Sequence, residues 1–319
     1  MRRWHVFIDR ATLGTILMHI PDGFLSTPVW ATLDVAAAPA AALLVRRAQR
    51  DFDESKIPLL GVMGAFVFAA QMINFPVGIG TTGHLVGGAL LAYTLGPAPA
   101  SVVMCAILAI QALVFQDGGV LALGANVLNM AVFGVLAGYL PFYLWGGGKW
   151  RRSAIFVGGV FSVLTSAILA LAELLLSGVK MPAMVLGISL ALFLVSALLE
   201  GAITLTVVQA LEAIQPNVIQ RRTGGLPLLT GAVGAVAVLL GGVGVVFAST
   251  APDGIWKLAA QTGIASRATT LLSTPLSNYH AAFLQGGWLP RASAGIAGIA
   301  LVYVVCLVMA RMAARRRSA

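Results

Sequence analysis

Four histidines, His5, His19, His84 and His280, are the side chains best suited to bind a transition metal. If translation begins at Met18, His19 becomes the second residue and lies next to a free α-amine. The amine, the deprotonated backbone amide of His19 and its imidazole Nδ1 would then close a five-membered and a six-membered chelate ring on one ion. Such planar nitrogen coordination favours Ni(II) or Cu(II) over tetrahedral Zn(II).

A fourth nitrogen must come from elsewhere in the chain. His84 is the other histidine that borders the outer face of the apolar body, and we expect it to complete the square. A metal-bound imidazole usually donates its second N–H to an outer-shell acceptor. The candidates for this acceptor are Asp22, Gln71 and Asn74.

Each histidine also admits an ordinary structural interpretation. We expect His5 and His280 to be surface residues, with a transient metal contact left open for His280. Hydrogen-bonded structural roles are the alternative for His19 and His84. Ligation is favoured for this pair because of the second-position spacing and their shared external placement.

These residues belong to a strongly apolar chain. Of its 319 residues, 59% are hydrophobic and only 10% are charged, whereas soluble domains carry about 25% charged residues. No soluble domain of this size could bury so much apolar surface, so the composition predicts an all-α integral membrane protein in the lipid bilayer. The net charge of +9 comes from short basic clusters between apolar runs, which argues against a nucleic-acid partner.

Apolar runs of about 20 residues predict membrane-spanning helices. We expect nine, with an uncertainty of one, because the third run is too short to cross the membrane alone. The predicted spans are 28–47, 57–75, 84–95, 97–116, 121–146, 153–177, 182–212, 226–249 and 288–310.

Lysine and arginine favour cytoplasmic loops, and here they cluster in alternate loops. This pattern predicts an amino terminus outside the cell membrane and a carboxyl terminus in the cytoplasm. The predicted cytoplasmic clusters are Arg46, Arg47, Arg50 and Lys56; Lys149, Arg151 and Arg152; Arg221 and Arg222; and Arg311, Arg315, Arg316 and Arg317.

A long external loop, residues 250–287, is sufficient for a small folded cap. We expect 18–222 to form a seven-span metal-capture bundle and 223–319 a two-span accessory part. Polar residues gather on the predicted external side, which suits a capture site open to the outside. The alternative is that they only satisfy one another and the backbone at helix ends. Glu200 is the only acid predicted well inside a span.

Four sequence runs resemble the substrate-capture component of nickel/cobalt energy-coupling-factor transporters, the CbiM/NikM family. They are MHIPDGFL (18–25), QMINFPV (71–77), GTTGHL (80–85) and GANVLNM (124–130). The resemblance covers about residues 18–222. The remainder resembles the small accessory component of the same systems, CbiN/NikN, although that family's Pro-Asp-Gly-Leu-Glu motif ends here in Ile255 and Trp256.

The resemblance implies a helical bundle that binds Ni(II) or Co(II) through the amine of Met18, the amide and imidazole of His19, and His84. The ion is a transported ligand, and no resident cofactor is expected. Implied partners are a transmembrane coupling (T) subunit and two cytoplasmic ATPase subunits. The sequence has no Walker-type phosphate loop, so ATP hydrolysis would take place in those partners. The choice between nickel and cobalt is left open.

Residues 1–17 depart from the family pattern, because with them attached the nitrogen of Met18 is a peptide amide. They make a poor signal peptide, since Asp9 and Arg10 interrupt the apolar run. We expect a misassigned start codon, with Met18 as the true amino terminus.

Two other classes of function are alternatives. An intramembrane enzyme is disfavoured, because the sequence lacks the H-E-x-x-H motif of zinc hydrolases. A stand-alone metal channel or proton-coupled metal carrier is the main alternative. The sequence shows no internal repeat of the kind found in many secondary transporters, so this alternative gains no support from it.

Overall fold

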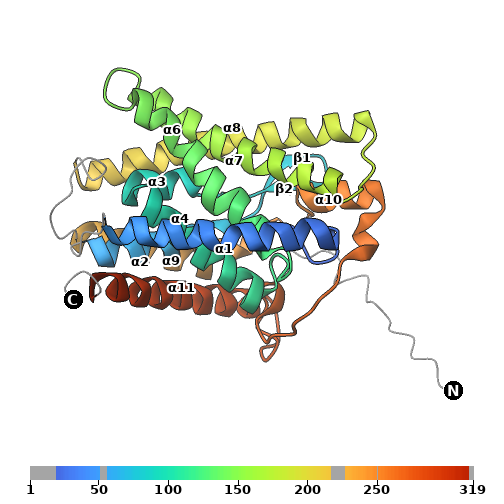
Figure 1. Ribbon diagram of the computed structural model, residues 1–319. Coiled ribbons are helices and arrows are strands. Elements are labelled where there is room, and N and C mark those ends of the chain that lie inside the picture. Colours follow the sequence, from blue (N-terminus) through green and yellow to red (C-terminus); the bar gives the residue numbers. More distant parts are fainter. Residues whose placement is uncertain (1–18, 51–55, 217–226, 250, 316–319) are drawn as a thin grey trace.

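Helices form in every run that the sequence marks as a span (Figure 1). The computed structural model describes residues 19–50, 56–216, 227–249 and 251–315, with side chains described as far as residue 312. Met18, residues 1–17 and the predicted domain boundary at 222–223 lie outside these ranges. Within them the chain is mostly helical, with one short hairpin, which confirms the all-α prediction.

Seven helical segments in the described ranges are long and apolar enough to cross a membrane. Lipid offers no hydrogen-bond partner to backbone groups, so a spanning helix needs about 20 apolar residues. These segments confirm a multi-pass membrane protein. They are Thr27–Arg50, Pro97–Phe115, Leu123–Trp145, Arg151–Leu176, Ala183–Ile214, Pro227–Val246 and Leu289–Met312.

Some of these segments join several helical elements. Two contain π-helical stretches, which are common at functional sites. The elements are α1 (Thr27–Arg50), α4 (Pro97–Ile110) with the π-helix η3 (Gln111–Phe115), α5 (Leu123–Asn126) with the π-helix η4 (Val127–Gly134) and α6 (Val135–Trp145), α7 (Arg151–Leu176), α8 (Ala183–Ile214), α9 (Pro227–Gly242) with the 3-10 turn η5 (Gly244–Val246), and α11 (Leu289–Arg315).

The second predicted span, 57–75, ends earlier than expected. Helix α2 is Ile57–Gln71, and the chain then forms an antiparallel hairpin of β1 (Phe75–Gly78) and β2 (Thr81–Gly83). The hairpin lies at one end of the bundle, on the right in Figure 1, and we call this the hairpin end. The hairpin turns the chain back toward the bundle interior and leads into His84.

The third predicted span, 84–95, is a broken helix rather than a continuous one. Residues 84–87 are not helical, and α3 is only Gly88–Leu95. Gly87 has a φ of 77°, a left-handed conformation that glycine adopts without steric cost. A helix of eight residues is only about 12 Å long, so this stretch enters the bundle partly as non-helical chain.

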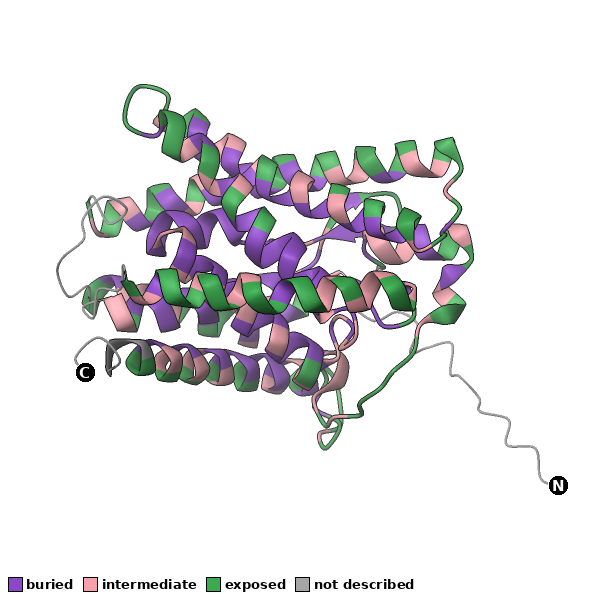
Figure 2. Ribbon diagram, viewed as in Figure 1, coloured by how far each residue is buried: buried purple, intermediate pink, exposed green. Residues whose placement is uncertain are grey.

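Glu200 of α8 supplies the hydrogen bonds that this break requires. Its Oε2 accepts from the backbone N–H of Val86 and its Oε1 from that of Gly87, both at 2.8 Å. Non-helical backbone at membrane depth is tolerated where protein surrounds it, and α3 is buried along its whole length (Figure 2). The acid predicted well inside a span therefore stabilises the break.

Helices α9 and α11 both pack against α2 and against each other. Small residues allow the close approach that is typical of membrane helices. Two glycines of α2 face side chains of α11. Gly61 lies against the ring of Tyr303, and Gly64 lies against Cys306. The last two predicted spans are therefore packed on the rest of the bundle.

The chain between α9 and α11 folds over the hairpin end, and we call residues 251–288 the cap loop. The backbone N–H of Thr82 in β2 donates to the carbonyl of Pro252 at 3.0 Å. Asp253 caps a helix by accepting the N–H of Trp256 at 2.8 Å, a usual role for aspartate. The elements of the cap loop are α10 (Gly254–Thr262) and the 3-10 turns η6 (Ile264–Arg267) and η7 (Ser277–Tyr279).

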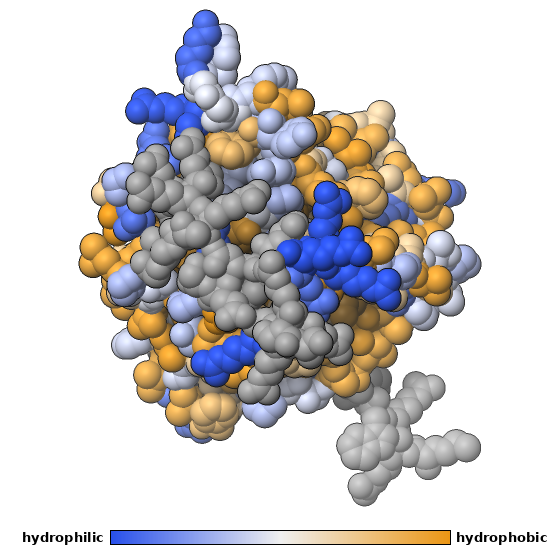
Figure 3. Space-filling view, turned by 60° about the vertical axis from the view of Figure 1, so that its left-hand side comes forward, coloured by the Kyte–Doolittle hydropathy of each residue, from blue (hydrophilic) through white to orange (hydrophobic). Residues whose placement is uncertain are grey.

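Figure 3 looks obliquely onto the end opposite the hairpin. Hydrophilic side chains gather there, and hydrophobic side chains cover much of the flanks. Arg46, Arg47 and Arg50 at the end of α1 are exposed. An apolar flank between polar ends is the surface expected of a membrane-spanning bundle.

We expect Glu200→Gln to lower the stability of the protein. An amide has one acceptor oxygen where the carboxylate has two, so one backbone N–H of the broken helix loses its partner, at a cost of about 1–3 kcal/mol. Thermal unfolding in detergent measures the change. Glu212→Gln on the same helix is the matched control, because Glu212 pairs with Arg151 in a partly exposed ion pair worth less than about 1 kcal/mol. Equal unfolding midpoints for both variants would contradict the assigned role of Glu200.

Candidate metal centre

The segment that follows Met18 is held at the hairpin end by Asn126. The backbone N–H of Ile20 donates to Oδ1 of Asn126 at 3.0 Å, and Nδ2 of Asn126 donates back to the carbonyl of Ile20 at 3.1 Å. The same carbonyl accepts from the N–H of Gly119 at 2.9 Å. These bonds fix the backbone beside His19. Only 2% of the surface of His19 is exposed to solvent.

Asp22 anchors the same segment to the turn before α5. Its carboxylate accepts the backbone N–H groups of Val120, Leu121 and Ala122 at 2.8 to 3.3 Å. Asp22 was a candidate outer-shell acceptor for a histidine. The structure places its carboxylate on these backbone groups, so it shapes the segment that carries His19.

The imidazole of His19 contacts Asp117, with 3.1 Å between Nδ1 and Oδ1. An ionised carboxylate only accepts hydrogen bonds, so Nδ1 carries the hydrogen and Nε2 carries the lone pair. Nε2 is buried and has no hydrogen-bond partner among the described residues. Buried polar atoms are nearly always paired, so this nitrogen is suited to bind a cation.

Gly118 makes the approach of this loop to His19 possible. Its φ is 94°, a region that residues with a side chain rarely adopt. A Cβ atom at this position would lie 2.8 Å from Cβ of His19. The glycine after Asp117 therefore lets the loop pass directly against the histidine.

His84 lies on the non-helical stretch, residues 84–87, that follows β2. Its Nδ1 donates to the carbonyl of Leu85 at 2.8 Å, which leaves the lone pair on Nε2. The centroids of the His19 and His84 rings are 6.2 Å apart, and the ring planes are inclined by 52°. With metal–nitrogen bonds of about 2 Å, two imidazoles on one ion have centroids about 4.5 to 6.4 Å apart. The two rings are therefore close enough to share an ion.

Both rings line one cavity of about 80 Å³. One water needs about 10–15 Å³ on this measure, so the cavity has room for an ion and a few waters. Asn126, Asn129, Ser166 and Asp253 bring oxygen atoms to its lining. Burial, together with the negative charge of Asp117, raises the pKa of the Asp253 carboxyl to about 8. A cation in the cavity would oppose this shift, because it favours the ionised carboxylate.

The other two candidate outer-shell residues, Gln71 and Asn74, differ in their hydrogen-bond partners. Nε2 of Gln71 donates to the carbonyl of Val86 at 2.8 Å, two residues beyond His84. Both polar side-chain atoms of Asn74 are buried without a partner among the described residues, while its backbone carbonyl accepts from Ser249 at 2.9 Å. Gln71 therefore supports the backbone that carries His84, and the Asn74 side chain forms no hydrogen bond with either ring in the described part of the chain.

Asp117 and Tyr279 belong to the site, although the sequence did not single them out. Asp117 is 98 residues from His19, and Tyr279 is 162 residues from Asp117. No spacing rule connects positions so far apart. The available signal for Asp117 was an acid just beyond the outer end of a predicted span and before two glycines, whereas Tyr279 had no signal.

Side chains alone do not complete a metal site in the described ranges. There, no group of three or more His, Cys, Asp or Glu side chains could hold an ion. The other nitrogens of the predicted chelate are the backbone amide of His19 and the amine of Met18, which lies outside those ranges. His280 is exposed on the cap loop, and His5 is not in the described part of the chain.

Comparison with known proteins gives concordant results. The family model of the cobalt uptake substrate-specific transmembrane region, CbiM, matches residues 19–218. A putative metal transport protein of Haloquadratum walsbyi is 37% identical over 206 residues, which cover 63% of this chain and 93% of that protein. The fused nickel transport protein NikMN of Rhodobacter capsulatus is 29% identical over 330 aligned positions, covering 89% of this chain and 95% of its own length.

A solved structure has the same fold over the larger part of the chain. The crystal structure of a truncated transition metal transporter is 33% identical and superposes with a TM-score of 0.55, covering 61% of this chain and 99% of that one. The region matched by the family model, residues 19–218, contains both histidines and the residues that position them, apart from the cap loop. The chain therefore belongs to the CbiM family of cobalt uptake transmembrane proteins, with a NikN-like part fused to its carboxyl end.

Proposed function

We propose that this protein is the substrate-binding component of an ATP-driven transporter of the energy-coupling-factor type that imports Ni(II) or Co(II). The observation that carries this proposal is the pair of histidine rings, His19 and His84, on one cavity. The centroids of the two rings are 6.2 Å apart. The names of the relatives, which refer to nickel and to cobalt transport, support the same substrates.

The ligands would be the α-amine of Met18, the backbone amide and imidazole of His19, and the imidazole of His84. In the structure Nδ1 of His19 faces Asp117, whereas the chelate requires Nδ1 on the metal. A half-turn of the ring about the Cβ–Cγ bond exchanges Nδ1 with Cδ2 and moves Nε2 toward Asp117. The carboxylate would then accept from Nε2–H, which is the usual arrangement of a metal-bound histidine.

The donor set bears on the choice of ion. Four nitrogens, one of them a deprotonated amide, form a planar site of the kind that Ni(II) and Cu(II) prefer. We therefore favour nickel as the better-held ion, with cobalt as the second substrate.

The direction of transport follows from the basic helix ends. Lysine and arginine favour the cytoplasmic side, so the hairpin end and its cavity would face outward, with the amino terminus outside. Residues 18–222 would capture the ion and 223–319 would assist. The T subunit and two ATPase subunits would couple release to ATP hydrolysis, since the sequence has no Walker-type loop of its own.

Purified protein is expected to bind one Ni(II) ion. His19→Ala and His84→Ala should each weaken this binding more than about 100-fold, since even loss of an outer-shell partner costs 10–100-fold. Equilibrium dialysis with Ni(II) measures the affinity. His280→Ala is the matched control and should bind as the wild type does. Wild-type affinity in both cavity variants would refute the proposed site.

The role of Met18 can be tested by comparing two forms of the protein. The form that begins at Met18 with a free amine should bind Ni(II) at least about tenfold more tightly than the form that retains residues 1–17, a difference of about 1.4 kcal/mol or more. Amino-terminal sequencing of metal-loaded protein from native cells identifies the natural form. Recovery of intact Met1 on that protein would exclude the amine as a ligand.

Vesicles that contain this protein alone should not accumulate nickel. Accumulation should require the T subunit, both ATPase subunits and ATP. Radioactive nickel uptake into proteoliposomes distinguishes the two cases. Uptake by the protein alone, without ATP, would instead establish a stand-alone channel or carrier.

A further inference from the structure

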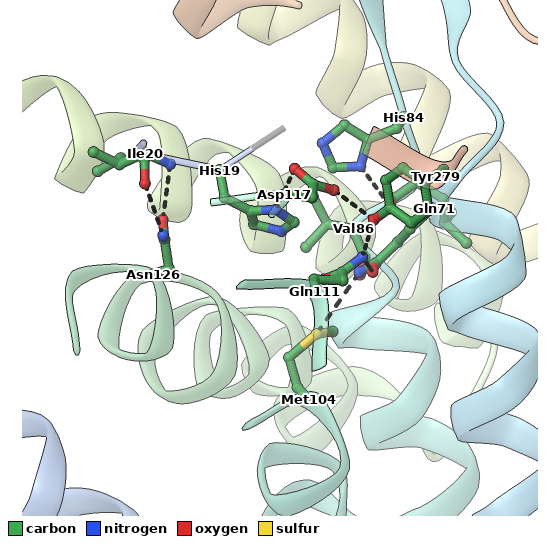
Figure 4. Close-up of polar contacts among 11 residues, drawn as sticks. His19, Ile20, Gln71, His84, Val86, Met104, Gln111, Asp117, Asn126 and Tyr279 are labelled. Carbon is green, nitrogen blue, oxygen red and sulfur yellow. Dashed lines mark hydrogen bonds and ion pairs between the residues drawn. The ribbon is translucent and has the colours of Figure 1, made fainter. Parts of the chain in front are cut away.

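A continuous path of hydrogen bonds connects the two histidines through the interior of the protein (Figure 4). It begins at His19 and ends on the backbone that follows His84. Every link is between atoms 2.6 to 3.1 Å apart. The path runs through Asp117, Tyr279, Gln111, Gln71 and the carbonyl of Val86.

The donors and acceptors along this path agree in direction. Nε2 of Gln71 donates to Val86, and Nε2 of Gln111 donates both to Oε1 of Gln71 and to the hydroxyl of Tyr279. The Tyr279 hydroxyl therefore accepts one hydrogen bond and gives its own hydrogen to Oδ2 of Asp117 at 2.6 Å. Hydrogen bonds to an ionised group are short and about twice as strong as neutral ones. All four side chains are at least 98% buried, so water does not compete for them.

Tyr279 is the only one of these side chains that comes from the cap loop. Its backbone has a φ of 54°, and that of Asn278 is 58°, conformations that cost free energy for residues with side chains. The ring stacks on Phe115, with centroids 4.9 Å apart and planes inclined by 17°, and lies near Phe68. These contacts hold the hydroxyl at the junction between Asp117 and Gln111.

We propose that Tyr279 and Asp117 are positioning residues for the captured metal ion. Tyr279 holds one oxygen of Asp117, and the other oxygen of Asp117 fixes the imidazole of His19. Through Gln111 and Gln71, the same hydroxyl is connected to the backbone that carries His84. The fused accessory part thereby sets the relative placement of the two histidine ligands, an assignment that rests on the proposed metal-capture function.

Tyr279→Phe removes the hydroxyl and keeps the ring. With Ni(II) as the probe, we expect its affinity to fall 10–100-fold, the range for loss of an outer-shell partner. The visible absorption bands of the bound ion should also shift, because the direction of the His19 lone pair changes. Asp117→Asn should act in the same sense. The double variant should lose little more than the stronger single variant, because both substitutions break one coupled unit.

Tyr303→Phe is the matched control. It makes the same substitution in the same accessory part, on α11, where the ring packs against Gly61. Its Ni(II) affinity and absorption spectrum should equal those of the wild type. Asp117→Asn also serves as the second route to the answer if Tyr279→Phe does not fold, because it tests the same contact from the opposite side.

Wild-type affinity and an unshifted spectrum in both Tyr279→Phe and Asp117→Asn would overturn this proposal while leaving metal capture intact. Lower thermal stability with an unchanged spectrum would also overturn it, because the residues would then be structural only. Absence of Ni(II) binding in the wild-type protein would instead refute the proposed function itself.

Discussion

The structure depends on one constraint, which is that polar groups inside a membrane protein must find their partners within the protein. Residues 84–87, between β2 and α3, are not helical, which brings His84 beside His19 and leaves backbone N–H groups without helical partners. Glu200 accepts two of them. A continuous helix from residue 84 would have formed its own backbone hydrogen bonds. It would also have removed the non-helical stretch, residues 84–87, that places the imidazole of His84. The position of His84 therefore depends on the hydrogen bonds that the buried acid Glu200 accepts.

The same constraint explains why the site is built from so many separate segments. His19, Gln71 and the neighbouring pair Gln111 and Asp117 come from three separate segments of the capture bundle, and Tyr279 comes from the cap loop. Buried polar atoms that position a histidine need partners of their own, because a half-satisfied network is less stable than an apolar core. Most atoms of this network have one, whereas Oε1 of Gln111 has none among the described residues. The π-helical turn Gln111–Phe115 fits this view, since it supplies both the amide of Gln111 and the ring on which Tyr279 stacks.

The sequence was informative where local chemistry determines structure. Apolar runs predicted the long helices, and the position of His19 after Met18, with His84 at a glycine-rich turn, predicted two side chains that the structure places 6.2 Å apart. It was uninformative where partners are distant in the chain. The break in the third span depends on Glu200, more than 110 residues away, and the contact of Asp117 with His19 follows no spacing rule. Asp22 was expected near a ring, but in the structure it accepts from three backbone groups, as capping residues do.

Because the accessory part is fused to the capture bundle, the cap loop is covalently held near the site to which it contributes Tyr279. The cap loop reaches the site through polar contacts that include those of Thr82 with Pro252 and of Tyr279 with Asp117. A separate protein would lose translational and rotational entropy when it formed these contacts. A loop connected at its two ends to α9 and α11 is instead present at a high effective concentration near the site. Because those helices pack on α2, whose last residue is Gln71, the anchor of the loop and the network beneath His84 share one element. A displacement of α11 relative to α2 would therefore alter the placement of Tyr279 and of Gln71 together, and so the separation of the two histidines.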